Sequence, residues 1–200
     1  MLKLLLITVF VTTASVTPAT EMISRMIEAV YIPEKTIILE GIDSNGVQYV
    51  LKYERSEDLL EETIGGETEK FYGNEMEPFL RLFFFQLTDK PESLKKRTQK
   101  TLDILSEQNI DISKTSLSVS DADGSITVSI GTGSRFDGSN SFQIYRSNSL
   151  PASLKTGERK VLFSDYHKSP FPLTFPGRID ILENGELISS VFFLREEYRD

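Results

Sequence analysis

The sequence has 200 residues, of which 39% are hydrophobic and 26% charged, a composition typical of one soluble globular domain. The formal net charge is −8 and the longest basic run is Lys95-Lys96-Arg97, which argues against nucleic acid or anionic membrane surfaces as partners. Cysteine is absent, which excludes disulfides and a lipid-anchoring cysteine.

Residues 1–19 are typical of a secretory signal peptide. Lys3–Val11 supplies the positive start and the apolar stretch, and Thr17-Pro18-Ala19 supplies a small-residue cleavage site; cleavage after Ala14 is the alternative. An N-terminal membrane anchor is disfavoured, because the apolar run is about half as long as a membrane span requires. We therefore expect a soluble periplasmic protein with a single domain over residues 20–200.

The first helix of the mature chain is predicted over Glu21–Tyr31, because its apolar residues recur on one helical face. Thr20 is the expected N-cap, and Pro33 is expected to end the helix. The apolar positions of this face are Met22, Ile23, Met26, Ile27 and Val30.

Four antiparallel strands are predicted next, over residues 36–42, 47–55, 59–64 and 68–72. Asn45-Gly46 indicates a hairpin between the first two strands, and Gly65-Gly66 indicates a turn between the last two. In the second strand the apolar Tyr49, Leu51 and Tyr53 alternate with mostly polar residues. This alternation predicts one buried face and one face in water.

The segment Met76–Leu87 is apolar on almost every side and is interrupted only by Arg81 and Gln86. A surface helix keeps its apolar residues in one stripe, so this helix must be covered on more than one side. Burial of its apolar side chains is worth roughly 1.5–3 kcal/mol each, and about twelve residues are too few to cross a bilayer. We expect the helix in the hollow of a curved sheet. Its apolar residues are Phe79, Leu80, Leu82, Phe83, Phe84, Phe85 and Leu87.

A further helix is predicted from Asp89 and Pro91 to about Gln108, with a sparse apolar stripe that places it at the rim of the sheet. Asn184-Gly185 predicts a tight hairpin near the end of the chain. The remaining strands are predicted over residues 116–120, 125–130, 142–146, 154–155, 160–166, 178–183 and 186–194.

The predicted fold class is α+β and mainly antiparallel β. About eleven strands in one sheet must twist and curl, which gives an unclosed, barrel-like sheet. The sheet is expected to be accompanied by an N-terminal helix and by two inserted helices that act as lids over an apolar concave face.

Residues suited to catalysis or metal binding are scarce. His167 is the only histidine, and neither a cysteine nor a Gly-x-Ser-x-Gly motif is present. A zinc site needs several His or Cys ligands, and Asp121–Gly124 lacks the later ligands of a calcium loop. We therefore expect no enzyme activity, no metal and no cofactor. A pair of distant carboxylates for sugar hydrolysis stays open, although no residue singles one out.

The concentration of Phe, Leu and Tyr on the inferred inner face has two interpretations. It is either a well-filled core or a pocket for an apolar ligand such as acyl chains, with the Met76–Leu87 helix as its lid.

The order of these elements, together with several short runs, resembles the LolA-like family of periplasmic carriers of outer-membrane lipoproteins. The resemblance covers nearly all of the mature chain. Its runs are Val50–Arg55, Ser129–Gly131 followed by Phe142–Arg146 and Leu150-Pro151, Phe163–Tyr166, Phe175–Ile179, Asn184-Gly185 and Val191–Phe193.

The resemblance implies an unclosed barrel whose apolar cavity takes up acyl chains beneath a helical lid. In the carrier, an arginine at the end of the second strand hydrogen-bonds the lid, and Arg55 matches it. Ser56 stands where proline is usual and Leu59 where an aromatic residue is usual. The alternative for Arg55 is a surface charge paired with Glu57 or Asp58. In lacking cysteine, the chain resembles the soluble carrier rather than the membrane-anchored receptor of the same fold.

We expect a monomer that binds lipoproteins or acyl lipids, with an inner-membrane release complex and an outer-membrane acceptor as further partners. The alternative is a regulatory or structural envelope protein on the same fold, with a permanently filled core. The residues expected to line the cavity and lid are Tyr49, Leu51, Tyr53, Leu59, Phe79, Leu80, Phe83, Phe84 and Leu87, with Arg55 as the lid latch.

Overall fold

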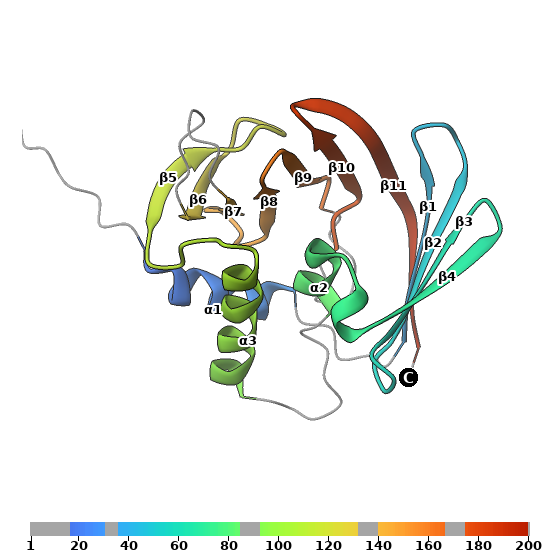
Figure 1. Ribbon diagram of the computed structural model, residues 1–200, viewed down its shortest axis with the longest axis horizontal. Helices are drawn as coiled ribbons and strands as arrows, with labels where there is room; N and C mark the ends of the chain where they lie inside the picture. Colours follow the sequence, from blue (N-terminus) through green and yellow to red (C-terminus); the bar gives the residue numbers. More distant parts are fainter. Residues whose placement is uncertain (1–16, 31–35, 85–92, 132–139, 167–174, 200) are drawn as a thin grey trace, which may run out of the picture.

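The computed structural model describes residues 17–30, 36–84, 93–131, 140–166 and 175–199. Within them, eleven strands form one antiparallel sheet in the order β4-β3-β2-β1-β11-β10-β9-β8-β7-β6-β5. The edge strands β4 and β5 do not pair with each other, so the curved sheet stays open (Figure 1). The predicted fold class is confirmed. The strands are β1 Thr36–Asp43, β2 Gln48–Glu54, β3 Leu59–Ile64, β4 Glu67–Tyr72, β5 Thr115–Val119, β6 Ile126–Gly131, β7 Ser141–Tyr145, β8 Pro151–Thr156, β9 Arg159–Ser164, β10 Arg178–Glu183 and β11 Glu186–Arg199.

Strand β1 joins two meanders, β1–β4 and β5–β11, because it pairs with β2 on one side and with β11 on the other. The register between β1 and β11 shifts between Glu40 and Gly41. A Cβ atom at Gly41 would lie 2.2 Å from the carbonyl oxygen of Phe192. Glycine is therefore required at this position, because the backbone of β11 approaches too closely for any side chain.

The two predicted Asn-Gly hairpins form, by different means. Asn184 and Gly185 have φ angles of 53° and 83°, the two positive values that a type I′ turn requires. In the β1–β2 loop, the Asp43 carboxylate instead accepts the backbone N–H groups of Asn45 and Val47, each at 2.8 Å. Both turns connect neighbouring antiparallel strands, β1 to β2 and β10 to β11.

In the described part of the chain, three α-helices and one 3₁₀ turn accompany the sheet. The N-cap position of the first helix is Pro18, so the prediction of Thr20 as the cap is wrong. The third helix is capped by Ser93, and its predicted start at Asp89 and Pro91 lies outside the described residues. The helices are α1 Ala19–Ala29, α2 Pro78–Phe84 and α3 Leu94–Glu107, and the 3₁₀ turn is η1 Gly73–Glu75.

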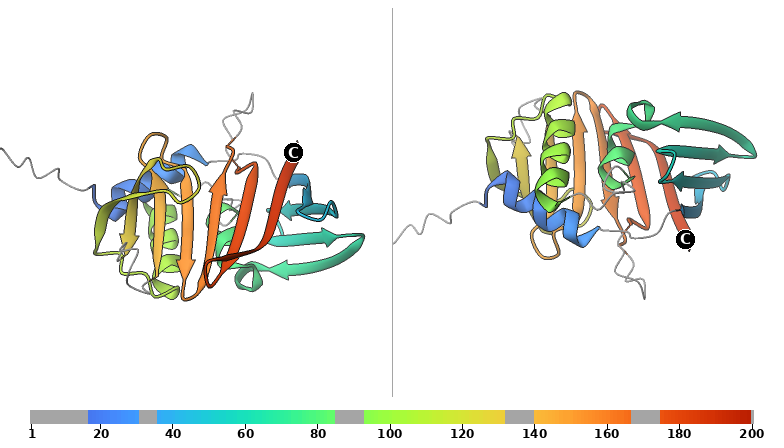
Figure 2. Two further views of the ribbon diagram at one scale, coloured as in Figure 1. Left: turned by 90° about the horizontal axis from the view of Figure 1, so that it is seen from above. Right: turned by 90° about the horizontal axis from the view of Figure 1, so that it is seen from below.

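All three helices lie on the concave side of the sheet, α1 and α3 beneath β5–β8 and α2 beneath β9–β11 (Figures 1 and 2). Helix α3 is buried more deeply than its sparse leucines predicted. Its Thr98 and Thr101 are buried beside Leu105, and the Thr98 hydroxyl lies 2.9 Å from that of Ser24 on α1. The two helices therefore pack against each other as well as against the sheet.

Candidate ligand-binding site beneath helix α2

Helix α2 meets the concave face through a continuous row of aromatic rings. Phe83 lies between Phe163 of β9 and Phe175, which precedes β10, with ring centroids 5.3 and 5.0 Å away. Along the rest of the row, the ring centroids are 6.3 Å apart for Phe79–Phe163, 5.3 Å for Phe175–Phe193 and 5.9 Å for Phe193–Tyr49. Such spacings are typical of edge-to-face and tilted aromatic pairs. The row runs Phe79, Phe163, Phe83, Phe175, Phe193, Tyr49.

The structure brings most of the predicted site residues together in one buried cluster. The side chain of Phe84 and the whole of Leu87 lie outside the part of the chain that the structure describes. The predicted residues within the cluster are Tyr49, Leu51, Tyr53, Phe79, Leu80 and Phe83.

Leu59 is buried, but it lies on the other face of its strand. The register pairs Glu54 with Leu59 and Tyr53 with Leu60. Because successive side chains of a strand point to opposite faces, Leu60 rather than Leu59 shares the concave face with Tyr53. The prediction that Leu59 lines the concave face is therefore wrong, and Leu60 takes that place in the cluster.

The aromatic row ends at Tyr49, where the concave face becomes acidic. The Tyr49 hydroxyl donates a hydrogen bond to the Glu62 carboxylate. Burial, and then the negative charge of Glu62, raise the pKa of Tyr49 above its ordinary value, so the hydroxyl remains a protonated donor. Next to it, a pocket of about 300 Å³ is lined by Glu62, Ile64, Glu67 and Glu69. The concave face thus offers an apolar part beneath α2 and an acidic part on β3 and β4.

Two ion pairs attach α2 to its neighbours. Glu77, which precedes the helix, accepts from one guanidinium nitrogen of Arg159 on β9 at 3.1 and 3.2 Å. Arg81 within the helix lies 3.1 Å from the Glu107 carboxylate on α3. Arg81 is the one charged residue in an otherwise apolar helix, which was the only signal in the sequence for this attachment.

The aromatic contacts contribute more to holding α2 in place than the exposed Glu77–Arg159 ion pair does. Phe79 and Phe83 are 6% and 2% exposed, and burial of each is worth roughly 1.5–3 kcal/mol. The Glu77–Arg159 pair is almost half exposed on both sides, and such pairs contribute about 0.2–1 kcal/mol each. Retention of α2 therefore depends mainly on apolar surface that another apolar group could cover equally well.

Arg55 lies in the turn between β2 and β3, where its carbonyl oxygen accepts the N–H of Asp58 at 3.3 Å. Asp58 in turn accepts the hydroxyl proton of Tyr53 at 2.8 Å, which connects this turn to the concave face. A contact between the Arg55 side chain and the lid stays a prediction.

Among the described residues, no group of three or more His, Asp or Glu side chains is arranged to hold a metal ion. In the same part of the chain, no helix combines the length and the apolar character needed to span a membrane. His167 lies outside the described residues.

No protein-family model and no curated protein matches the chain. Two similar solved structures are a LolA superfamily protein from Nitrosomonas europaea and a putative outer membrane lipoprotein-sorting protein domain from Vibrio parahaemolyticus. The first is 10% identical over 92% of this chain and 94% of its own, with a TM-score of 0.45. The second is 8% identical over 90% and 91%, with a TM-score of 0.46. Likeness at this level does not identify a ligand or a function for this chain.

Proposed function

We propose that this protein is a non-enzymatic periplasmic carrier that binds the acyl chains of lipidated cargo between α2 and the concave face of the sheet. The observation that carries this proposal is the aromatic row, in which Phe79 and Phe83 of α2 lie against rings of the sheet. Lipoproteins or acyl lipids are the cargo, and an inner-membrane release complex and an outer-membrane acceptor are the further partners.

Binding would exchange one apolar surface for another. Helix α2 has seven residues, and isolated helices shorter than about 12–15 residues are marginal in water, so its place depends on packing. When acyl chains displace it, the rings of the sheet stay covered and little apolar area is newly exposed to water. The exchange is then readily reversible, which a carrier requires.

The start of α1 bears on where a signal peptide would be removed. Ala19 is the first residue of α1 and is buried, and the carbonyl oxygen of Pro18 accepts the N–H groups of Glu21 and Met22 at 3.1 Å each. Cleavage after Ala19 would remove that acceptor, whereas cleavage after Ala14 would keep it. We therefore favour Ala14, and the mass of the exported protein tests this choice.

The close packing of the row supports one alternative function. If α2 never leaves the sheet, the protein is a regulatory or structural envelope protein with a permanently filled core, and it binds protein partners rather than acyl chains.

A reversible clamp on α2 separates the two functions. Glu77→Cys and Arg159→Cys, joined by a reducible bifunctional maleimide, would hold the start of α2 to β9. We expect the unmodified chain to bind a fluorescent fatty acid, the clamped chain to lose most of that binding, and reduction to restore it. Asp121→Cys with Lys160→Cys, which replaces an ion pair away from α2, is the matched control and should bind normally when clamped. Absence of binding in the unmodified chain would refute the carrier and favour the filled core.

A further inference from the structure

The two edges of the sheet differ in how they are protected. Natural sheet edges are usually blunted by charged side chains, which discourage pairing with another strand. Strand β4 carries Glu67, Glu69 and Lys70, all exposed. Strand β5, Thr-Ser-Leu-Ser-Val, has no charged residue. One edge therefore carries the usual protection and the other does not.

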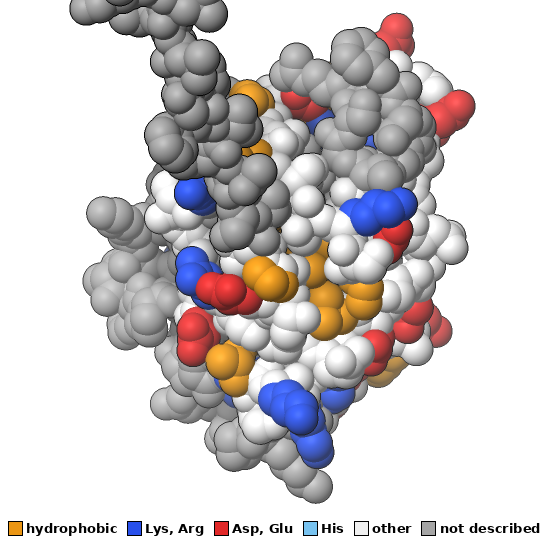
Figure 3. All heavy atoms as spheres, turned by 90° about the vertical axis from the view of Figure 1, so that its left-hand side faces the viewer, with side chains coloured by type: hydrophobic (Ala, Val, Ile, Leu, Met, Phe, Trp, Pro, Cys, Tyr) orange, Lys and Arg blue, Asp and Glu red, His pale blue; other side chains and the backbone are white. Residues whose placement is uncertain are grey.

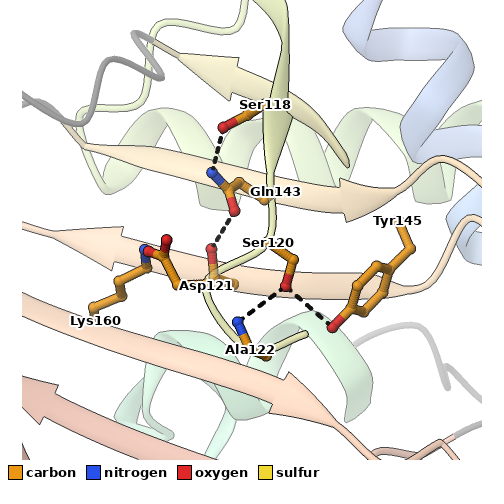
Figure 4. A network of polar contacts seen from close by, with 8 residues as sticks. Ser118, Ser120, Asp121, Ala122, Gln143, Tyr145 and Lys160 are labelled. Atoms are coloured by element: carbon orange, nitrogen blue, oxygen red, sulfur yellow. Dashed lines mark hydrogen bonds and ion pairs between the residues drawn. The ribbon is translucent and has the colours of Figure 1, made fainter. Parts of the chain in front are cut away.

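The two faces of strand β5 differ in chemical character. Its serines face the molecule: the Ser118 hydroxyl lies 3.2 Å from the donating Gln143 amide, and the Ser120 hydroxyl that follows lies 3.4 Å from the Tyr145 hydroxyl (Figure 4). Leu117 and Val119 lie on the other face, which Leu117 shares with the buried Val128 of β6, but at the edge of the sheet they remain 46% and 47% exposed. Hydrophobic side chains gather on this side of the molecule (Figure 3).

The backbone of β5 presents hydrogen-bonding groups to the same edge. The Ser120 N–H donates to Ser125 at 2.8 Å, and the Lys114 carbonyl oxygen accepts from Gly131 at 2.9 Å. Because residues of an antiparallel strand alternate between the two sides, the even-numbered residues of β5 bond β6. The N–H and C=O groups of Thr115, Leu117 and Val119 are therefore directed away from it, and no strand in the described part of the chain pairs there.

We propose that β5 pairs with β5 of a second copy of this chain, antiparallel and centred on Leu117. In this register Leu117 lies opposite Leu117 of the second copy, and Thr115 lies opposite Val119. All three residues of each strand then exchange both backbone hydrogen bonds, which makes six bonds in total. Registers shifted by two residues would leave one of the three without its counterpart.

A second copy suits this edge better than an unrelated peptide, because the strand matches itself. Reading outward from Leu117, serine is followed by a β-branched residue in both directions, Thr115 on one side and Val119 on the other. The centre is uncharged, so a chain with net charge −8 meets no repulsion there. At the ends of the paired strands, Lys114 of one copy lies opposite the uncharged Ser120 of the other. The proposal does not depend on the carrier function.

Sedimentation of the full chain over a range of micromolar concentrations tests the association. We expect a concentration-dependent dimer that Leu117→Lys abolishes, because two lysines would then lie directly opposite each other. Leu187→Lys is the matched control: Leu187 is 56% exposed and lies outside β5, so the dimer should persist. A chain that stays monomeric throughout, forms larger aggregates, or responds equally to both lysines would overturn the proposal.

The absence of cysteine allows a test of the register itself. Opposite residues of a hydrogen-bonded pair have Cα atoms about 5.5 Å apart, within disulfide range. Thr115→Cys mixed with Val119→Cys should therefore cross-link readily under mild oxidation. Neither variant alone should do so, because Thr115 of the two copies would lie about 14 Å apart, four residues along the strand. Cross-linking of each variant alone as fast as the mixture, or of neither, would overturn the register.

Discussion

Helices α1 and α3 cover the same concave face as helix α2, but the two regions are held in different ways. Helices α1 and α3 have 11 and 14 residues and pack against each other, with Ile23 and Ile27 of α1 fully buried. Helix α2 has only seven residues, of which Phe79, Leu80, Leu82 and Phe83 are buried, and two ion pairs attach it to its neighbours. Under the proposed function, α1 and α3 form a permanent region of this face and α2 a displaceable region, because α2 is shorter and has fewer packed neighbours.

The largest expected effect is in the permanent region. Ile27→Ala in α1 should lower the free energy of unfolding by about 2–5 kcal/mol, because it leaves a cavity between packed elements that cannot collapse. Urea unfolding followed by far-UV circular dichroism measures it. Ile188→Ala, at a side chain that is 57% exposed, is the control and should stay within about 0.5 kcal/mol of the parent. A similar loss in both variants would contradict the assignment of α1 to the core.

A smaller global effect is expected in the displaceable region, although more atoms are removed. Phe83→Ala should lower the free energy of unfolding by about 1–2 kcal/mol, below the roughly 3–5 kcal/mol of Phe→Ala in a rigid core. The reason is that α2 can open locally without unfolding the sheet. Hydrogen exchange should quicken in residues 78–84 and stay unchanged in α1.

Binding of a fluorescent fatty acid to Phe83→Ala sharpens the comparison further. Weaker seating of α2 should favour the guest and tighten binding. A loss of stability as large as that of Ile27→Ala, with no change in local exchange, would place α2 in the permanent core.

The ion pair between Glu77 and Arg159 should have a smaller effect again. Arg159→Glu should weaken the attachment of α2 to the sheet by about 0.2–1 kcal/mol. Added salt should also weaken this attachment in the parent, because it screens the ion pair. The exchanged pair Glu77→Arg with Arg159→Glu should restore most of the loss. Hydrogen exchange in α2 measures the parent and both variants. If the exchanged pair is no better than the single variant, the two side chains are not coupled.

The elements of the fold could be predicted because their signals are local. Alternation located β2, and Asn184-Gly185 located the last hairpin. The pairing of β1 with β11 could not be predicted, since it joins segments about 150 residues apart and local patterns carry no record of it. Gly41 was missed for the same reason, because its need for a bare backbone arises only where β11 approaches.

The site was predicted in its apolar part and missed in its polar part. Leu59 was assigned to the concave face, but the length of the turn after Glu54 places Leu60 there instead. Arg81 was seen only as an interruption, because its partner Glu107 lies on another helix. Hydrophobic pattern thus finds what must be buried, whereas ion pairs between elements depend on the finished fold.

The smallest expected effect concerns the outer face of β2–β4, opposite the acidic pocket. Hydrogen bonds from Lys70 and then Lys52 lower the pKa of Glu61 below its ordinary value. A glutamate whose pKa is lowered by folding stabilises the fold at pH values above the pKa of the same side chain in the unfolded chain, about 4.3. This contribution is lost as the pH falls below that value. Glu61→Gln should therefore cost less than about 1 kcal/mol at pH 7 and progressively less as the pH falls below 4. Urea unfolding at pH 7 and pH 3.5 measures the difference between the two chains. A gap that widens in acid would reverse the sign and rule out the charged form of Glu61 as the stabilising one.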